Sequence, residues 1–422
     1  MRKPVSSVVG QRCLLAVILS LTTFGLLSSC AEAPPQGVSG ATSAAQPTQS
    51  FAQWREGFRV QALAAGISAQ TFDAAFAGLE PDDSVVAADR SQPEFTRPVW
   101  QYLESAVSPA RVRNGQDRLL QNTETLQRID TTYGVDREAV VAIWGMESNF
   151  GQQMGSKNVI RSLATLAYEG RRPDFGRNQL IAALQILQHG DVPTSNMIGS
   201  WAGAMGQTQF IPTTYNRYAV DFDGDGRRDI WSSPTDALAS TANYLSTSGW
   251  RRGQSWGFEV RLPQGFDYAQ ADMDIRKPVS EWQRQDVQPM NGNLPAEPHA
   301  SASLLLPAGY RGPAFLVTDN FRAILKYNNS TSYALAVGLL ADSFKGGGQL
   351  VGQWPVNDAP LSRTERIELQ QCLAKRGFDP GTADGIIGAN TRKAIRAYQQ
   401  SQGLPADGYP TPVLLGRLRS GR

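Results

Sequence analysis

The chain of 422 residues carries 40 Lys and Arg, 38 Asp and Glu, and 2 His, with 41% hydrophobic and 18% charged residues. At roughly 150 residues per domain, this ordinary globular composition allows two or three domains. Neither His189 nor His299 has a partner at metal-ligand spacing such as HExxH, which argues against a zinc site or a serine–histidine catalytic system. The near-zero net charge, without a basic stripe of interleaved aromatic residues, argues against a dedicated nucleic-acid binder.

The first thirty residues indicate an export signal. A positive start (Met1–Lys3 and Arg12) precedes an apolar stretch, Cys13–Leu27, which is short for a membrane-spanning helix of about 20 residues. The sequence Leu27-Ser28-Ser29-Cys30 resembles the bacterial lipobox, which implies cleavage before Cys30 and lipid on that cysteine. The alternative is a plain secretory signal with an incidental cysteine.

The cysteines fit this interpretation. Cys13 would leave with the signal and Cys30 would carry lipid, so Cys372 would be the only free thiol and no intrachain disulfide would form. The apolar neighbours of Cys372 predict a small buried hydrophobic residue and not a nucleophile. In the lipoproteins that the lipobox resembles, the residue after the lipidated cysteine helps sorting. Ala31 in place of Asp favours a periplasmic protein anchored by lipid to the outer membrane.

Two stretches rich in Pro, Gly or Ser divide the remaining chain. Residues 31–50 have the composition of a flexible tether, and a second break runs from Gly346 to Pro360. The predicted organisation is therefore a signal peptide (1–29), a tether (30–50), a body (51–345), a linker (346–360) and a tail (361–422).

Helical periodicity dominates the body, where apolar residues recur at three- and four-residue spacings, as in the run from Leu180 to Leu187. A Pro- and Gly-rich stretch, 253–313, contains short alternating runs such as Phe258–Leu262 and predicts a small strand-bearing insertion. The predicted fold class is mainly α. Neither an internal repeat nor a nucleotide motif such as GxxxxGK[ST] or GxGxxG occurs.

One carboxylate stands out in the body. The segment 135–151 predicts a helix with Asp136 as its N-cap and Gly151 near its end. Glu147 continues the apolar stripe that includes Trp144. Apolar surroundings raise the pKa of a carboxyl group and favour a general acid. The alternative is a glutamate at a helix end that simply reaches solvent.

A second segment, GAMGQTQFIPTTY at 203–215, combines glycines, amide side chains and an aromatic ring. Glycines let the backbone approach a ligand closely, while amides and an aromatic face suit a sugar. The alternative is a glycine-rich loop that only leads into a helix.

These two segments together resemble the membrane-bound lytic murein transglycosylase B family, whose signatures are W-G-x-E-[ST]-x-[FY]-G and G-A-M-G-x-x-Q-F-x-P-[ST]-[ST]-Y. A third match begins with Phe321–Ser330 and continues through Tyr333 to Val337. The resemblance covers Phe51 to about Lys345. It implies a lysozyme-like α fold with a peptidoglycan groove.

By position, the resemblance makes Glu147 the sole catalytic acid and base. It places these residues in the glycan cleft: Ser200, Gln209, Phe210, Tyr327, Asn328 and Tyr102. The implied reaction cleaves the β-1,4 bond between N-acetylmuramic acid and N-acetylglucosamine without water, closing a 1,6-anhydro ring. The 2-acetamido group of the substrate takes the part of a second carboxylate, so no cofactor is required.

Two other functions stay open. A muramidase would cleave the same bond with water, and an inactive scaffold would bind the wall without cleaving it. The expected partner is the glycan strand of peptidoglycan in all three cases, and wall-synthesis or wall-remodelling proteins are the candidate protein partners.

An acidic loop follows the second motif. Asp221, Asp223 and Asp225, with glycine next, match the opening of an EF-hand calcium loop, in which Arg227 holds position 7. The match then degrades, because Ser232 stands where a bidentate glutamate is required. The family carries a similar modified loop that a later aspartate closes, and Asp236 is the candidate. We therefore expect a structural calcium site, with an acidic turn as the alternative.

The tail predicts two or three short amphipathic helices. Its run from Asp384 to Thr391, DGIIGANT, resembles the peptidoglycan-binding domain type 1, with its D-G-x-x-G-x-x-T pattern. Most of these positions serve turn geometry and capping. A small helical domain of this kind would raise the effective concentration of the body on the wall.

Overall fold

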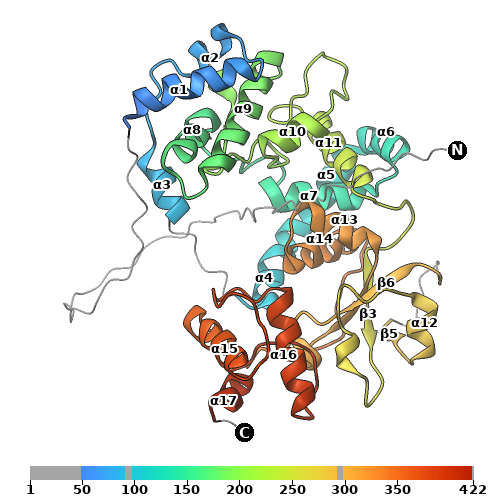
Figure 1. The fold of residues 1–422 in the computed structure, drawn as a ribbon. Helices are drawn as coiled ribbons and strands as arrows, with labels where there is room; N and C mark the ends of the chain where they lie inside the picture. Colours follow the sequence, from blue (N-terminus) through green and yellow to red (C-terminus); the bar gives the residue numbers. More distant parts are fainter. Residues whose placement is uncertain (1–48, 91–96, 292–297, 421–422) are drawn as a thin grey trace, which may run out of the picture.

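The computed structural model describes residues 49–90, 97–291 and 298–420. The predicted signal peptide, Cys30 and most of the tether lie outside the described residues. The mainly helical fold class is confirmed (Figure 1). The helices of the body and insertion are α1 (Phe51–Ala64), α2 (Ala69–Ala75), α3 (Asp83–Arg90), α4 (Val99–Ala106), α5 (Pro109–Gln121), α6 (Thr123–Tyr133), α7 (Arg137–Ser148), α8 (Val159–Glu169), α9 (Pro173–His189), α10 (Pro212–Tyr218), α11 (Pro234–Thr247), α12 (Val279–Arg284), α13 (Asp319–Tyr327) and α14 (Thr331–Phe344).

Two hydrophobic cores organise the helical body. One core lies among α1, α2, α8, α9 and α10, at the top of Figure 1, and the other lies around α7, α11, α13 and α14 in the middle. The short strands β1 (Lys157–Asn158) and β2 (Ile198–Gly199) pair antiparallel at the edge of the first core. Met205 and Phe210 of the segment that follows β2 belong to the first core.

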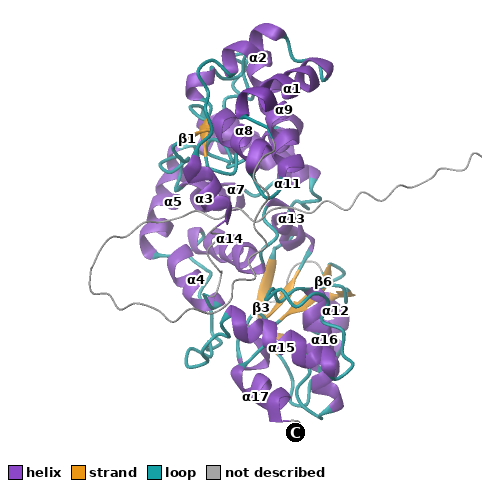
Figure 2. Cartoon of the chain, turned by 60° about the vertical axis from the view of Figure 1, so that its left-hand side comes forward, coloured by secondary structure: helices purple, strands orange, loops and turns teal. Residues whose placement is uncertain are grey.

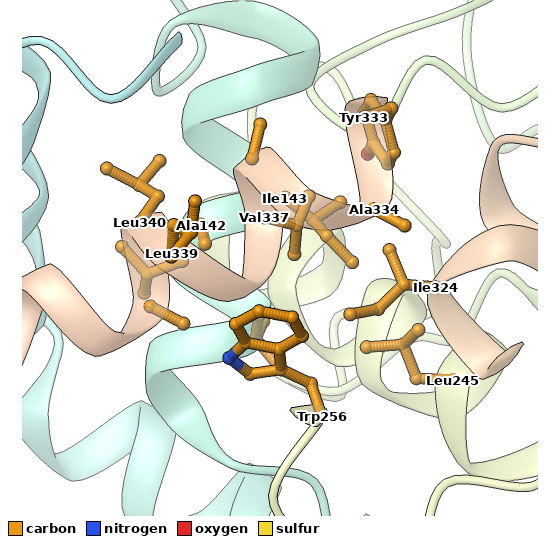
Figure 3. Close-up of a cluster of buried hydrophobic side chains, with 14 of the residues drawn as sticks. Ala142, Ile143, Leu245, Trp256, Ile324, Tyr333, Ala334, Val337, Leu339 and Leu340 are labelled. Atoms are coloured by element: carbon orange, nitrogen blue, oxygen red, sulfur yellow. The ribbon is translucent and has the colours of Figure 1, made fainter. Parts of the chain in front are cut away.

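The helix that carries Glu147, α7, is the central element of the second core. Residues from Ala139 to Gly145 are buried all round the helix, which is typical of a helix surrounded by protein. Figure 3 shows Ala142 and Ile143 of α7 facing Val337 and Leu340 of α14, with the ring of Trp256 beneath them. The position of α7 is therefore fixed by packing along almost its whole length.

The two ends of α7 differ in detail from the sequence prediction. Asp136 is the N-cap, as predicted, but its side chain makes no capping hydrogen bond. The helix ends at Ser148, shortly before Gly151, because Asn149 and Phe150 take positive φ angles of 49° and 60°. The ring of Phe150 then folds back against Gly145, where a Cβ would lie 2.7 Å from the ring. This reversal gives Glu147 a fixed place in the last turn.

The predicted strand-bearing insertion is a five-stranded antiparallel sheet in the order β4-β6-β7-β3-β5. Its strands are β3 (Gly257–Arg261), β4 (Lys277–Pro278), β5 (Gln288–Pro289), β6 (Ser301–Leu305) and β7 (Ala314–Val317). Phe258 pairs with Leu316 in the β3–β7 register. Helix α12 packs its buried Trp282 into the small core of this sheet. Figure 2 shows the sheet beside the C-terminal helices.

The tail forms three helices, α15 (Arg363–Lys375), α16 (Ala389–Ser401) and α17 (Pro412–Ser420), around a core of its own. Gln370 holds the predicted DGIIGANT turn, because its side chain accepts from the Gly385 amide at 2.8 Å and donates to Thr391 Oγ1 at 3.1 Å. These motif residues therefore serve the turn, as the sequence indicates.

The three-helix domain is docked on the insertion. Arg396 of α16 forms an ion pair with Asp272, and the Asp407 carboxylate accepts from the backbone amide of Tyr310 at 3.0 Å. The segment that precedes it is also held, since the ring of Trp354 lies 6.4 Å from that of Trp100. Across the described parts of the chain, no helix is both long enough and apolar enough to span a bilayer.

Candidate active site

Glu147 lies in the last turn of α7, half-buried between the two cores. Burial raises its pKa to about 7, while a hydrogen bond from Tyr333 opposes that rise. The Tyr333 hydroxyl, on α14, donates to Glu147 Oε1 at 2.6 Å. A carboxyl group with a pKa near neutrality holds its proton in about half of the molecules at pH 7, so it can give a proton and take one back.

Three tyrosines surround this carboxyl group. The negative charge of Glu147 adds to the effect of burial and raises the pKa of Tyr102, Tyr327 and Tyr333. All three phenols therefore stay protonated and act as neutral hydrogen-bond donors. Tyr102 and Tyr327 belong to the cleft set that the sequence predicts. The position of Tyr333 was visible in the third motif, but no sequence signal assigned it to Glu147.

Tyr327 connects Glu147 to the glycine-rich segment. Its hydroxyl donates to the backbone oxygen of Thr208 at 2.7 Å, and its ring lies 5.7 Å from that of Phe210. Phe210 is 2% exposed, and its ring packs against that of Tyr327. Asn328 ends α13 next to Tyr327 and is half-buried.

The other two predicted cleft residues lie in the segment between β2 and α10. Ser200 Oγ accepts from the Ala204 amide at 2.9 Å and closes a turn. Gln209 takes a positive φ of 52°, and its side-chain amide donates to the Gly206 oxygen at 2.8 Å. Both side chains are half-buried, and both are held by the backbone of their own segment.

The acidic loop brings three carboxylates together. Oxygens of Asp221, Asp223 and Asp236 lie within 4.8 Å of one another. Asp236 is fully buried at the start of α11, and burial raises its pKa to about 6 although backbone amides of the loop donate to it. Asp225 and Arg227 lie outside this group; the Asp225 carboxylate instead accepts from the Arg227 amide at 2.9 Å.

The residues that the sequence set aside lie away from Glu147. His189 is exposed and lies 3.2 Å from the Asp191 carboxylate, and His299 is exposed. Cys372 is free and only half-buried, packed against the core of the C-terminal domain. A cavity of about 300 Å³ near Asp136 is separate from the tyrosine-lined site, because Glu147 does not line it.

A helical body that holds a single carboxylic acid among three tyrosines defines an enzyme domain of the lysozyme-like class. The family described as "Transglycosylase SLT domain" matches residues 50–342, and that described as "Putative peptidoglycan binding domain" matches residues 362–418. The chain belongs to the transglycosylase SLT domain family. It is a lytic transglycosylase, an enzyme that acts on peptidoglycan.

Three related proteins agree with this assignment. SltB3 from Pseudomonas aeruginosa, in complex with NAG-anhNAM-pentapeptide, is 73% identical with a TM-score of 0.86, covering 88% of this chain and 100% of that one. Membrane-bound lytic murein transglycosylase B of Escherichia coli (strain K12) is 33% identical over 270 residues, 62% of this chain and 72% of that protein. The Escherichia coli lytic transglycosylase SLT35, in complex with calcium, is 29% identical with a TM-score of 0.60, covering 73% and 98%.

Proposed function

We propose that Glu147 is the sole acid and base of a reaction that cleaves the β-1,4 bond between N-acetylmuramic acid and N-acetylglucosamine and leaves a 1,6-anhydro end. The observation that carries this proposal is the pKa of about 7 that burial gives the Glu147 carboxyl group. A carboxyl group of this kind is protonated often enough to act first as an acid and is then a sufficient base.

The protons balance with this one group. Protonated Glu147 gives its proton to the glycosidic oxygen as the bond to the muramoyl C1 breaks, and the 2-acetamido oxygen of the same sugar bonds to C1. The carboxylate then takes the proton of the muramoyl 6-hydroxyl while that oxygen displaces the acetamido group. Glu147 ends protonated, ready for the next cycle, and water is not consumed.

The surroundings of Glu147 suit both halves of this cycle. The hydrogen bond from Tyr333 orients one carboxylate oxygen, so that the other is left for the substrate. Tyr102 and Tyr327 remain neutral donors because their pKa values are raised. The ligand of the SltB3 complex, with its anhNAM unit, supports the proposed product.

The test is mass spectrometry of the fragments that the protein releases from purified cell-wall sacculi. We expect muropeptides lighter by one water than hydrolysed ones from the wild-type protein and from Glu124→Gln, an exposed carboxylate used as the control. Glu147→Gln is expected to bind the wall and release nothing. Reducing-end products would contradict the proposal in favour of a muramidase, and release by Glu147→Gln would remove Glu147 from the chemistry.

We also propose that the acidic loop holds calcium in a structural role. The three carboxylates of Asp221, Asp223 and Asp236 are oxygen donors of the kind that calcium prefers, and they converge within 4.8 Å. The calcium complex of SLT35 supports this assignment. The ion would neutralise the buried Asp236 and hold the loop to α11, without a part in the proton transfers.

We further propose that a lipid on Cys30 anchors the enzyme to the outer membrane. An enzyme that acts on peptidoglycan from the periplasm needs no span of its own, and lipid on Cys30 would hold it at the outer membrane. We expect the mature wild-type protein to fractionate with outer membranes and its N-terminal peptide to carry acyl mass. Cys30→Ser is expected to be soluble in the periplasm. A wild-type N-terminal peptide without acyl mass would contradict the anchor.

A further inference from the structure

The side chain of Gln207 lies between the helix that carries Glu147 and the acidic loop. It is 4% exposed, and it belongs to the glycine-rich segment without being one of the predicted cleft residues. A buried amide side chain must find hydrogen-bond partners to avoid a large desolvation penalty. The partners of Gln207 come from both neighbouring elements.

Two hydrogen bonds join Gln207 to the catalytic end of α7. The indole Nε1 of Trp144 donates to Gln207 Oε1 at 2.9 Å, and Ser148 Oγ donates to the Gln207 backbone oxygen at 2.8 Å. Trp144 precedes Glu147 by three residues and Ser148 follows it directly. The two bonds therefore hold the helical turn on both sides of Glu147.

Two further bonds join Gln207 to the end of the acidic loop. Its backbone amide donates to the Ile230 oxygen at 2.9 Å, and its side-chain Nε2 donates to the Trp231 oxygen at 3.2 Å. The backbone at Gly151 leaves little room around this side chain, since a Cβ there would lie 2.7 Å from Gln207 Oε1. Gln207 is thus held by both elements and packed closely between them.

We propose that Gln207 is a positioning residue, which holds the last turn of α7 against the end of the acidic loop and so keeps Glu147 desolvated and in place. This inference rests on the proposed role of Glu147. Without the amide, the Trp144 N–H and the Trp231 carbonyl lose a buried partner. The last turn of α7 then loosens and water reaches the carboxyl group.

The test compares Gln207→Met, Trp144→Phe and the double variant. We expect Gln207→Met to lower kcat about tenfold or more with little change in KM, because a misplaced acid affects the reaction and not the binding of glycan. Hydration lowers the pKa of Glu147, so the basic limb of the pH–kcat profile should move to lower pH. The double variant should be little worse than Gln207→Met alone, because Gln207→Met already removes the hydrogen bond that Trp144→Phe deletes.

Two controls separate positioning from a general loss of stability. Gln370→Met removes an equally buried amide in the C-terminal domain, and it should lower the free energy of unfolding without moving the pH–kcat profile on a soluble glycan. Gln207→Glu keeps the size and the acceptor for Trp144, so it provides a folded variant if Gln207→Met unfolds. It should lower kcat, because an ionised carboxyl group cannot donate to the Trp231 oxygen. The added negative charge moves the basic limb to higher pH, so only the kcat of this variant bears on the positioning role.

The outcomes are distinguishable. An unchanged kcat in a folded Gln207 variant, or an unmoved basic limb in a folded Gln207→Met, while Glu147→Gln is inactive, would overturn the positioning role and leave the proposed function intact. Activity in Glu147→Gln would instead overturn the proposed function itself.

Discussion

The hydroxyl of Tyr333 donates a hydrogen bond of 2.6 Å to Oε1 of Glu147, across 186 positions of sequence. The bond joins α7 to α14, the two helices that form the middle of the second core. Because both helices are buried along most of their length, neither end of the bond can move without disturbing the core. The orientation of the catalytic carboxyl group is thus set by the packing of two helices.

Tyr333→Phe is expected to raise the pKa of Glu147 above about 7, because the lost hydrogen bond favoured the carboxylate. The basic limb of the pH–kcat profile should then move to higher pH. The value of kcat should also fall, about tenfold, because the carboxyl group loses its orienting partner. Turnover of a soluble glycan measured across the pH range checks both effects.

The control for this variant is Tyr310→Phe, which removes a hydroxyl from a ring that is 43% exposed on the insertion. It should leave the pH–kcat profile unchanged. A basic limb at the same pH in Tyr333→Phe and wild type would mean that the hydrogen bond does not set the pKa of Glu147.

Glu147→Gln is expected to make the protein more stable at alkaline pH. The pKa of the glutamate is 4.5 in the unfolded chain and about 7 in the folded protein. Between these values the folded state keeps a proton that the unfolded state has released, so the free energy of unfolding falls as pH rises, by about 3 kcal/mol in total. A glutamine does not titrate and avoids this loss.

Denaturant unfolding of both proteins at several pH values measures the difference. The free energy of unfolding of Glu147→Gln should exceed that of the wild type most at pH 8, and the two should converge toward pH 4.5. A constant difference across this range would show that Glu147 is not desolvated in the folded protein.

The sequence predicts local features of the site better than its long-range contacts. The apolar stripe of its own helix makes Glu147 a candidate acid, the family resemblance assigns it the role, and the structure places that helix in the core. Tyr333 could not be assigned in this way, because the contact depends on how α14 packs against α7. The role of Phe210 in the cleft stays a prediction, and the packing of its ring against Tyr244 and Tyr327 is a long-range contact that no local pattern indicates.

In the tail, too, the sequence predicts local structure but not long-range contacts. Its helices and its glycine turn follow local patterns, and the structure has both. The docking of Arg396 on Asp272 joins residues 124 positions apart and leaves no local signal. The prediction of a separate C-terminal domain agrees with the family match over residues 362–418 and with the core of its own, while its docking on the insertion had no signal in the sequence.

Calcium is expected to raise the unfolding temperature of the wild-type protein, and a chelator is expected to lower it. Asp221, Asp223 and Asp236 repel one another when no cation is present, and the ion binds the folded loop in preference to the unfolded chain. At a calcium concentration of about 100 times Kd, the stabilisation is about 3 kcal/mol, or about 5 to 10 °C for a domain of this size. Differential scanning calorimetry with calcium and with EDTA measures the shift.

Asp223→Asn should lose most of this calcium-dependent shift, because one of the three converging carboxylates becomes a neutral amide. Asp174→Asn is the matched control, since Asp174 is 88% exposed and pairs with Arg177 outside the loop. It should keep the full shift. An equal shift in both variants would place the calcium elsewhere, and no shift in the wild type would leave the loop as an acidic turn held by its own backbone amides.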